Sequence, residues 1–71
     1  MVRPQRGRCR LPEHLRNANM TPAEFARRMK VQRSTVSRWM TGERRMDYEN
    51  TVLAAMILGL HAEDMYEWLW S

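Results

Sequence analysis

A run of short polar and arginine side chains, RSTVSRWMT, occupies residues 33–41. If this run is an α-helix, successive residues turn by about 100°, and four polar side chains gather on one face with an arginine beside them. These residues are Ser34, Ser37, Arg38 and Thr41, with Arg33 in the first turn. A guanidinium group can donate two hydrogen bonds to O6 and N7 of guanine, whereas a hydroxyl group discriminates less between bases. This face is a candidate surface for reading a DNA sequence, and the alternative is an ordinary solvated helix face.

Two short helices joined by a tight turn are predicted to position this face. The first begins after Thr21, which can cap it, and Glu24 completes a Thr-x-x-Glu capping box. We expect this helix to run from Pro22 to Met29, and the second to run from about Arg33 until just before Gly42. Such a pair is a helix-turn-helix, whose second helix usually enters the DNA major groove.

Apolar residues recur on the opposite faces of both helices. Phe25 and Met29 lie four residues apart in the first helix. In the second helix three residues share one face at helical spacing: Val36, Trp39 and Met40. We expect these side chains to pack inward and to hold the polar face outward.

Three further helices are predicted around this pair. One runs from Pro12 to about Ala18 and ends near Asn19, which adopts the left-handed conformation more readily than most residues. Another follows a cap at Asp47 and ends at Gly59. Its apolar residues repeat as adjacent pairs four apart: Val52, Leu53, Met56 and Ile57. A fifth helix is expected from about Ala62, which makes the fold class all-α with five helices.

Aromatic residues would lie on two faces of the fifth helix. Trp68 shares a face with Met65 and Leu69, whereas Tyr66 and Trp70 lie four apart on another. A small core needs less apolar surface than this, and exposed apolar patches mark interaction sites. Tyr66, Trp68 and Trp70 are therefore a candidate homodimer surface, and the alternative is packing into the core.

Charge is distributed unevenly along the chain. Residues 1–45 contain all 12 Lys and Arg residues and three acidic residues, whereas residues 46–71 contain five acidic residues and no Lys or Arg. The two segments carry +9 and −5, which together give the net charge of +4. A basic front half is typical of a protein that binds a polyanion. The alternative is a solvated basic surface without a partner.

The first ten residues, MVRPQRGRCR, hold too few apolar side chains to fold by themselves. We expect a flexible basic arm over residues 1–10 and a globular domain over residues 11–71. The arm's arginines could follow DNA phosphates or enter a narrow minor groove. A disordered, solubilising leader is an equally open alternative. The residues concerned are Arg3, Arg6, Arg8 and Arg10.

Several classes of protein are not expected from this sequence. Cys9 is the only cysteine, so no disulfide can form within the chain. Cys9 and His14 fall far short of a four-ligand metal set, and we expect neither a metal nor another cofactor. No nucleophile–base pair or phosphate-binding loop is recognisable, so an enzyme is not expected. No apolar run approaches the roughly 18 residues of a membrane span, and we expect a cytoplasmic protein.

Residues 20–65 resemble the lambda-repressor-like helix-turn-helix domain of the XRE (Cro/repressor) class of transcription regulators. About two-thirds of the chain stands in that family's order and spacing, carried by Met20-Thr21, Glu24-Phe25-Ala26, Val31, Ser34-Thr35-Val36-Ser37-Arg38-Trp39, Gly42, Leu53 to Leu60, and Met65. The resemblance implies a compact bundle of five helices. It also implies a homodimer that binds a pseudo-palindromic operator in double-stranded DNA.

The resemblance also implies roles for individual residues. The family's base-reading positions fall on Arg33, Ser34 and Arg38, with Gln32 and Ser37 close by. The family's phosphate contacts fall near Arg16, Thr41 and Arg44, and Thr21 and Arg45 complete the set of candidate phosphate contacts.

Three residues depart from the pattern and concern docking on DNA rather than the fold. Pro22 stands where the family often has a Gln that bonds phosphate. Lys30 replaces a frequent Gly in the turn, and Met40 replaces a frequent Glu.

The leading hypothesis is a sequence-specific transcription regulator, a repressor of phage, plasmid or mobile-element type. An antitoxin or another protein-interaction module with the same fold is the alternative, with the aromatic and acidic C-terminal segment as the binding surface. Its partner would be a toxin, an antirepressor or RNA polymerase.

Overall fold

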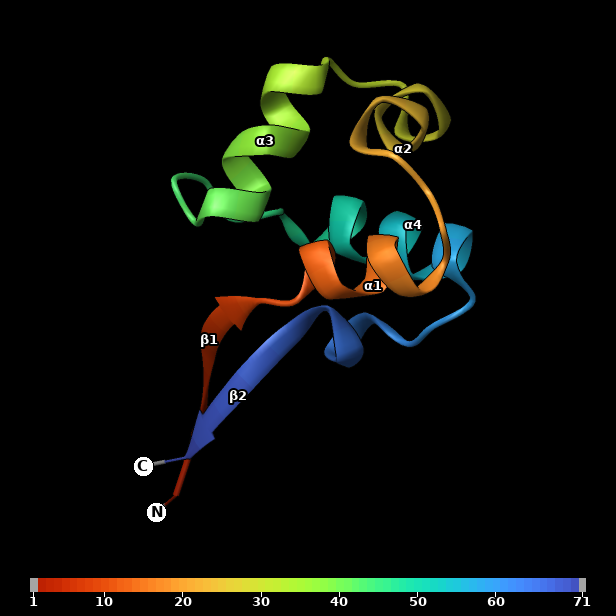
Figure 1. Ribbon diagram of the computed structural model, residues 1–71. Helices are drawn as coiled ribbons and strands as arrows, with labels where there is room; N and C mark the ends of the chain where they lie inside the picture. The colour runs from red at the N-terminus through yellow and green to blue at the C-terminus, as the bar shows by residue number, and fades with distance from the viewer. Residues whose placement is uncertain (1, 71) are drawn as a thin grey trace.

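The computed structural model of this protein describes residues 2–70. The described residues form four α-helices, one 3-10 helix and two strands, and the strands project from the helical body as a two-stranded sheet (Figure 1). In chain order these elements are β1 (Pro4–Cys9), α1 (Leu11–Asn17), α2 (Pro22–Met29), α3 (Arg33–Thr41), α4 (Tyr48–Leu58), the 3-10 helix η1 (Ala62–Met65) and β2 (Tyr66–Trp70).

Helices α2 and α3 have the predicted bounds because their ends are specified locally. The Thr21 hydroxyl accepts a hydrogen bond from the Glu24 amide at 3.1 Å and caps α2. The Glu24 carboxylate bonds Arg28 at 3.2 Å, four residues along the helix. Lys30 ends α2 with a φ of 58°, which is costly for a residue with a Cβ. Gly42 ends α3 with a φ of 83°, a conformation that glycine adopts readily.

Helices α1 and α4 also form where the sequence predicts them. Helix α1 begins and ends one residue earlier than expected, and Asn19 follows it with a φ of 56°. The Asp47 carboxylate caps α4 by accepting from the Asn50 amide at 2.8 Å. After Gly59, the Leu60 amide donates to the Ala55 carbonyl at 2.8 Å and closes the helix end.

One core joins the helices and the base of the sheet. Phe25, Met29, Val36 and Trp39 are buried in it, as their spacing predicts, and Met40 packs against it while partly exposed. Helix α4 buries mainly small side chains: its buried residues are Thr51, Ala54 and Ala55. Of its repeating apolar pairs, Ile57 packs against the core while partly buried, whereas Leu53 and Met56 are exposed. The small side chains let α4 approach its neighbours α2 and η1 closely.

The predicted fifth helix is wrong. Only residues 62–65 are helical, as one 3-10 turn, and residues 66–70 continue as β2. Tyr and Trp favour extended backbone where they can pair with another strand, and β1 supplies that pairing. Four α-helices and a two-stranded sheet therefore replace the five-helix bundle.

Residues 4–9 lie in β1, within the segment that was expected to be a flexible arm. Strand β1 pairs with β2 in antiparallel register, with Pro4 opposite Trp70 and Arg6 opposite Trp68, and the register shifts between Arg6 and Cys9. A Cβ on Gly7 would lie 3.0 Å from the Glu67 carbonyl oxygen, so glycine permits the close approach of the strands. We call β1 and β2 together the terminal sheet.

Candidate nucleic-acid interface

Helix α3 presents the candidate base-reading residues to solvent. All five are exposed in the structure: Gln32, Arg33, Ser34, Ser37 and Arg38. On the opposite face Val36 is fully buried and Trp39 is only 2% exposed. These two anchors fix how the helix is rotated about its axis, so the polar residues share one outward face.

The first turn of α3 brings two of these side chains together. The Ser34 hydroxyl lies 3.5 Å from the Gln32 side-chain oxygen, at the limit of a hydrogen bond. Gln32 makes no side-chain hydrogen bond that caps the helix. Gln32 is the N-cap of α3 and Ser34 is in its first turn, and in helix-turn-helix proteins this end of the helix contacts base edges.

The last turn of α3 leads into a basic loop. The Arg38 carbonyl accepts from the Thr41 hydroxyl at 3.2 Å and from the Arg44 amide at 3.2 Å. These bonds place the loop directly after the end of the helix, with the side chains of Arg44 and Arg45 exposed. The predicted phosphate contacts Thr41, Arg44 and Arg45 are thus gathered at one end of α3.

The other two predicted phosphate contacts lie elsewhere. Arg16 and Thr21 are exposed and line one shallow hollow of about 340 Å³ between α1 and α2. Their neighbours in that hollow include Asn19 and Pro22. The five candidates therefore form two groups, one at the α1–α2 junction and one after α3.

Two residues of the terminal sheet hold the buried Met46, which follows the basic loop in the chain. The Met46 amide donates to the Tyr66 hydroxyl at 3.0 Å, and the Met46 carbonyl accepts from Arg6 Nη1 at 2.8 Å. The Arg6 guanidinium also lies over the Tyr66 ring, 4.9 Å from its centre. Met46 was not predicted as a functional residue. The signal that could have indicated it is the tyrosine, because a buried hydroxyl needs a hydrogen-bond partner.

Ion pairs separate the arginines into two sets. Within residues 2–70, the pairs join Arg8 to Glu13 at 2.6 Å and to Glu67 at 2.9 Å, Arg10 to Glu13 at 3.5 Å, and Arg28 to Glu24 at 3.2 Å. No ion pair among these residues involves the arginines of α3 and the following loop: Arg33, Arg38, Arg44 and Arg45. The second set can meet an external anion without first breaking an internal pair.

The N-terminal arginines do not behave as one group. Arg3 is exposed, but Arg6 is bound to Met46 and stacked on Tyr66, and Arg8 and Arg10 are paired with carboxylates. Partial desolvation raises the pKa of Glu13, but the hydrogen bond and charge of Arg8 outweigh it and lower that pKa overall. The interpretation of these residues as an arm along DNA therefore does not apply to Arg6.

The candidate dimer residues are also divided. Tyr66 is 4% exposed and uses its hydroxyl within the protein, so it is not a surface residue. Trp68 and Trp70 are exposed, and the Trp68 indole N–H donates to the Glu63 carbonyl at 2.7 Å.

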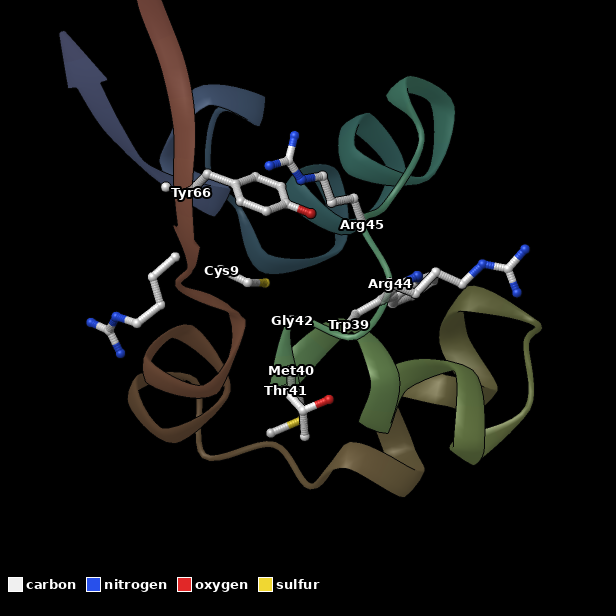
Figure 2. A pocket seen from close by; sticks show the side chains of 10 residues that line it. Cys9, Trp39, Met40, Thr41, Gly42, Arg44, Arg45 and Tyr66 are labelled. Carbon is white, nitrogen blue, oxygen red and sulfur yellow. The ribbon is translucent and has the colours of Figure 1, made fainter. Parts of the chain in front are cut away.

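A hollow of about 300 Å³ lies between the terminal sheet and the end of α3 (Figure 2). Cys9, Trp39 and Tyr66 line it, together with arginines of the loop. The side chains of Arg44 and Arg45 point in different directions, so they do not converge on one anion (Figure 2). Burial raises the pKa of the Cys9 thiol, although the Leu11 backbone and the Arg8 charge oppose the shift. The thiol therefore stays protonated and weakly reactive at neutral pH.

Metal and membrane features can be stated for the described part of the chain. Residues 2–70 bring together no group of three or more His, Cys, Asp or Glu side chains that could hold a metal ion. No helix among them has the length and apolar character that crossing a membrane requires.

Comparison with known protein families gives a match over nearly the whole chain. The family described as a helix-turn-helix domain matches residues 3–68, which include β1, the four helices and the first three residues of β2. No curated protein and no solved structure matches the chain significantly. In a helix-turn-helix the second helix of the pair is the one that enters the DNA major groove, and in this chain that helix is α3. The chain belongs to the helix-turn-helix domain family of DNA-binding proteins.

Proposed function

We propose that this chain is a sequence-specific transcription regulator that reads double-stranded DNA with α3 in the major groove. The observation that carries the proposal is the outer face of α3, where two arginines lie beside three short polar side chains and make no internal ion pair within the described residues. The base-reading residues are Gln32, Arg33, Ser34, Ser37 and Arg38.

Phosphate contacts fix the domain on the duplex in this proposal. The group after α3 would hold the strand beside the C-terminal end of the reading helix, and Arg16 with Thr21 would hold the strand beside α2. Backbone contacts of this kind position a protein without specifying sequence. Thr21 already uses its hydroxyl to cap α2, but a hydroxyl oxygen can accept one bond and donate another.

Repression is the simplest regulatory outcome, because occupying a promoter is sufficient to exclude polymerase. The proposed operator is pseudo-palindromic and is bound by two copies of the chain, as the resemblance to phage and mobile-element repressors implies. The proposed place of action is the cytoplasm, where the DNA of such elements is transcribed.

Selection of bound duplexes from a random library tests the proposal. The unsubstituted protein should enrich a defined sequence, and Arg38→Ala should then bind that sequence more weakly by about 1–3 kcal/mol. The same substitution should change binding to scrambled duplexes much less, because a base contact is lost and not a phosphate contact.

Arg28→Ala is the matched control. Arg28 is also an exposed helical arginine, but it lies on α2 and pairs with Glu24. It should retain the preference for the selected sequence. If Arg38→Ala loses the same affinity for selected and scrambled duplexes, Arg38 contacts phosphate and does not read a base.

Binding of a protein partner is the second candidate function. The exposed Trp68 and Trp70 favour it, because they share one face of the sheet and exposed apolar patches mark interaction sites. A toxin, an antirepressor or RNA polymerase would be the partner. A random-duplex selection that enriches no sequence would favour this candidate over DNA reading.

A further inference from the structure

The outer edge of β2 is a strand edge without the usual protection against pairing. Within residues 2–70, β2 forms a ladder with β1 alone, so its other edge has backbone groups without a strand partner. Beyond Tyr66 every residue of β2 is exposed. Leu69 is 57% exposed and Trp70 is 67% exposed, and they lie on opposite faces of the sheet.

The outer edge of β1 differs in two ways. It begins with Pro4, which has no N–H to donate, and its register shifts between Arg6 and Cys9. Proline and a bulge are features by which proteins prevent pairing at a sheet edge. Strand β2 contains no proline, and the charge of its one charged residue, Glu67, is met by Arg8 at 2.9 Å.

We propose that the outer edge of β2 pairs with the same edge of a second copy of this chain, giving a four-stranded antiparallel sheet in the order β1–β2–β2–β1. An antiparallel edge is complementary to itself, because a two-fold axis brings each donor to an acceptor. The partner is therefore another β2, and the protected β1 edges lie outside.

Side chains on both faces of the sheet fit this partner. Pairing places Trp68 and Trp70 of the two copies on one face and the two Leu69 side chains on the other. Aromatic pairs across strands stabilise a sheet, and four strands are stable where an isolated pair is marginal. Each copy contributes only the five residues of β2 to this contact, whereas a stable interface covers about 1,000 Å² or more. The dimer is therefore weak and concentration-dependent in the absence of DNA.

Charge gives this association a distinctive salt dependence. Each copy carries a net charge of +4, so two copies repel, whereas β2 contributes mainly uncharged contacts. Added salt screens the repulsion and strengthens the dimer. Binding to DNA has the opposite dependence, because salt weakens phosphate contacts.

Sedimentation of the full chain over a concentration series, without DNA, tests the pairing. The unsubstituted protein should shift from monomer to dimer, and higher salt should move the shift to lower concentration. Trp70→Glu should weaken the association at least tenfold. Met56→Glu is the control, because Met56 is similarly exposed at 71% but lies on α4.

Hydrogen exchange of the unsubstituted protein provides a second readout that needs no variant to fold. Amides of β2 should exchange more slowly at high protein concentration, since strand pairing protects them. Circular dichroism establishes whether Trp70→Glu is folded. Three results would overturn the proposal. The protein could sediment as a monomer at every concentration, the exchange rates of the β2 amides could be independent of concentration, or Met56→Glu alone could dissociate the dimer.

Only the role of this dimer at a pseudo-palindromic operator rests on the proposed function. If the chain dimerises through β2 but selects no DNA sequence, DNA reading fails and the pairing stands. If a monomer reads a single half-site through Arg38, the pairing fails and DNA reading stands.

Discussion

Arginines of the terminal sheet and arginines of α3 with its following loop occupy different environments. In the sheet, Arg6 binds the Met46 carbonyl and Arg8 binds two carboxylates. Arg33 and Arg38 on α3, and Arg44 and Arg45 in the loop, are exposed and make no ion pair among residues 2–70. Positive charge in the sequence therefore lies in two environments: it is held by contacts within the protein in the sheet, and it faces outward on α3 and the loop. Counting arginines cannot distinguish them, because both sets lie in the same basic half of the sequence.

The two regions meet at Met46, which connects the sheet to the basic loop. The sheet contributes the Tyr66 hydroxyl and the Arg6 guanidinium, and the loop contributes both backbone groups of one buried residue. The internal arginine thus helps to place Arg44 and Arg45, which precede Met46 in the chain. Substitutions in the sheet and in the loop test whether the two sets of arginines affect stability and DNA binding separately.

The largest effect is expected for Tyr66→Phe, which removes the hydroxyl that accepts from the Met46 amide. A buried donor without a partner costs about 1–3 kcal/mol of the free energy of unfolding. Denaturant unfolding measures this loss. Tyr48→Phe is the matched control, because Tyr48 is exposed and its substitution should change stability little. If the two variants lose equally little free energy of unfolding, the bond between Tyr66 and Met46 does not stabilise the loop.

A smaller effect, on DNA binding alone, is expected when Arg44 and Arg45 are both replaced by Ala. Each phosphate contact contributes about 0.9 to the slope of log affinity against log salt. Between 50 and 200 mM salt, the unsubstituted protein should therefore lose about tenfold more affinity than the double variant. Binding titrations on any duplex give the two slopes. An unchanged slope would mean that these unpaired arginines do not contact phosphate.

The smallest effect is expected for Arg8→Ala, because exposed ion pairs contribute little to stability. The salt slope of DNA binding should be unchanged. The pKa of Glu13 is lowered in the folded protein. The ionised Glu13 therefore stabilises the fold above its ordinary pKa of about 4.3, and this stabilisation is lost as pH falls. The difference in Tm between the two proteins should therefore disappear in acid. A difference that persists at pH 2 would point to packing by the Arg8 side chain instead of charge.

The helix-turn-helix was predictable because its determinants are close together in the chain. Thr21 caps α2 three residues before the amide it binds, and Asp47 does the same for α4. Gly42 and Gly59 end helices at the residue where they stand. Local hydrogen bonds and helical spacing therefore gave correct bounds for α2, α3 and α4.

The terminal sheet was not predictable in the same way, because each strand depends on a partner about 60 residues away. In isolation, five residues such as YEWLW fit a helix with two aromatic faces as well as a strand with alternating faces. Arg6 and Arg8 resemble a solvated tail until Met46 and Glu67 are placed beside them. The roles of these arginines follow from long-range contacts, which composition and spacing do not contain.

The register of β1 and β2 has a consequence for joining this domain to others. Pro4 lies opposite Trp70, so segments attached before β1 and after β2 leave the domain side by side (Figure 1). A domain whose entry and exit points coincide can be inserted into a surface loop of a host protein with little distortion of either. The same proximity allows a short peptide to close the chain into a ring. New ends could then be opened at the exposed turn around Asn19, between α1 and α2.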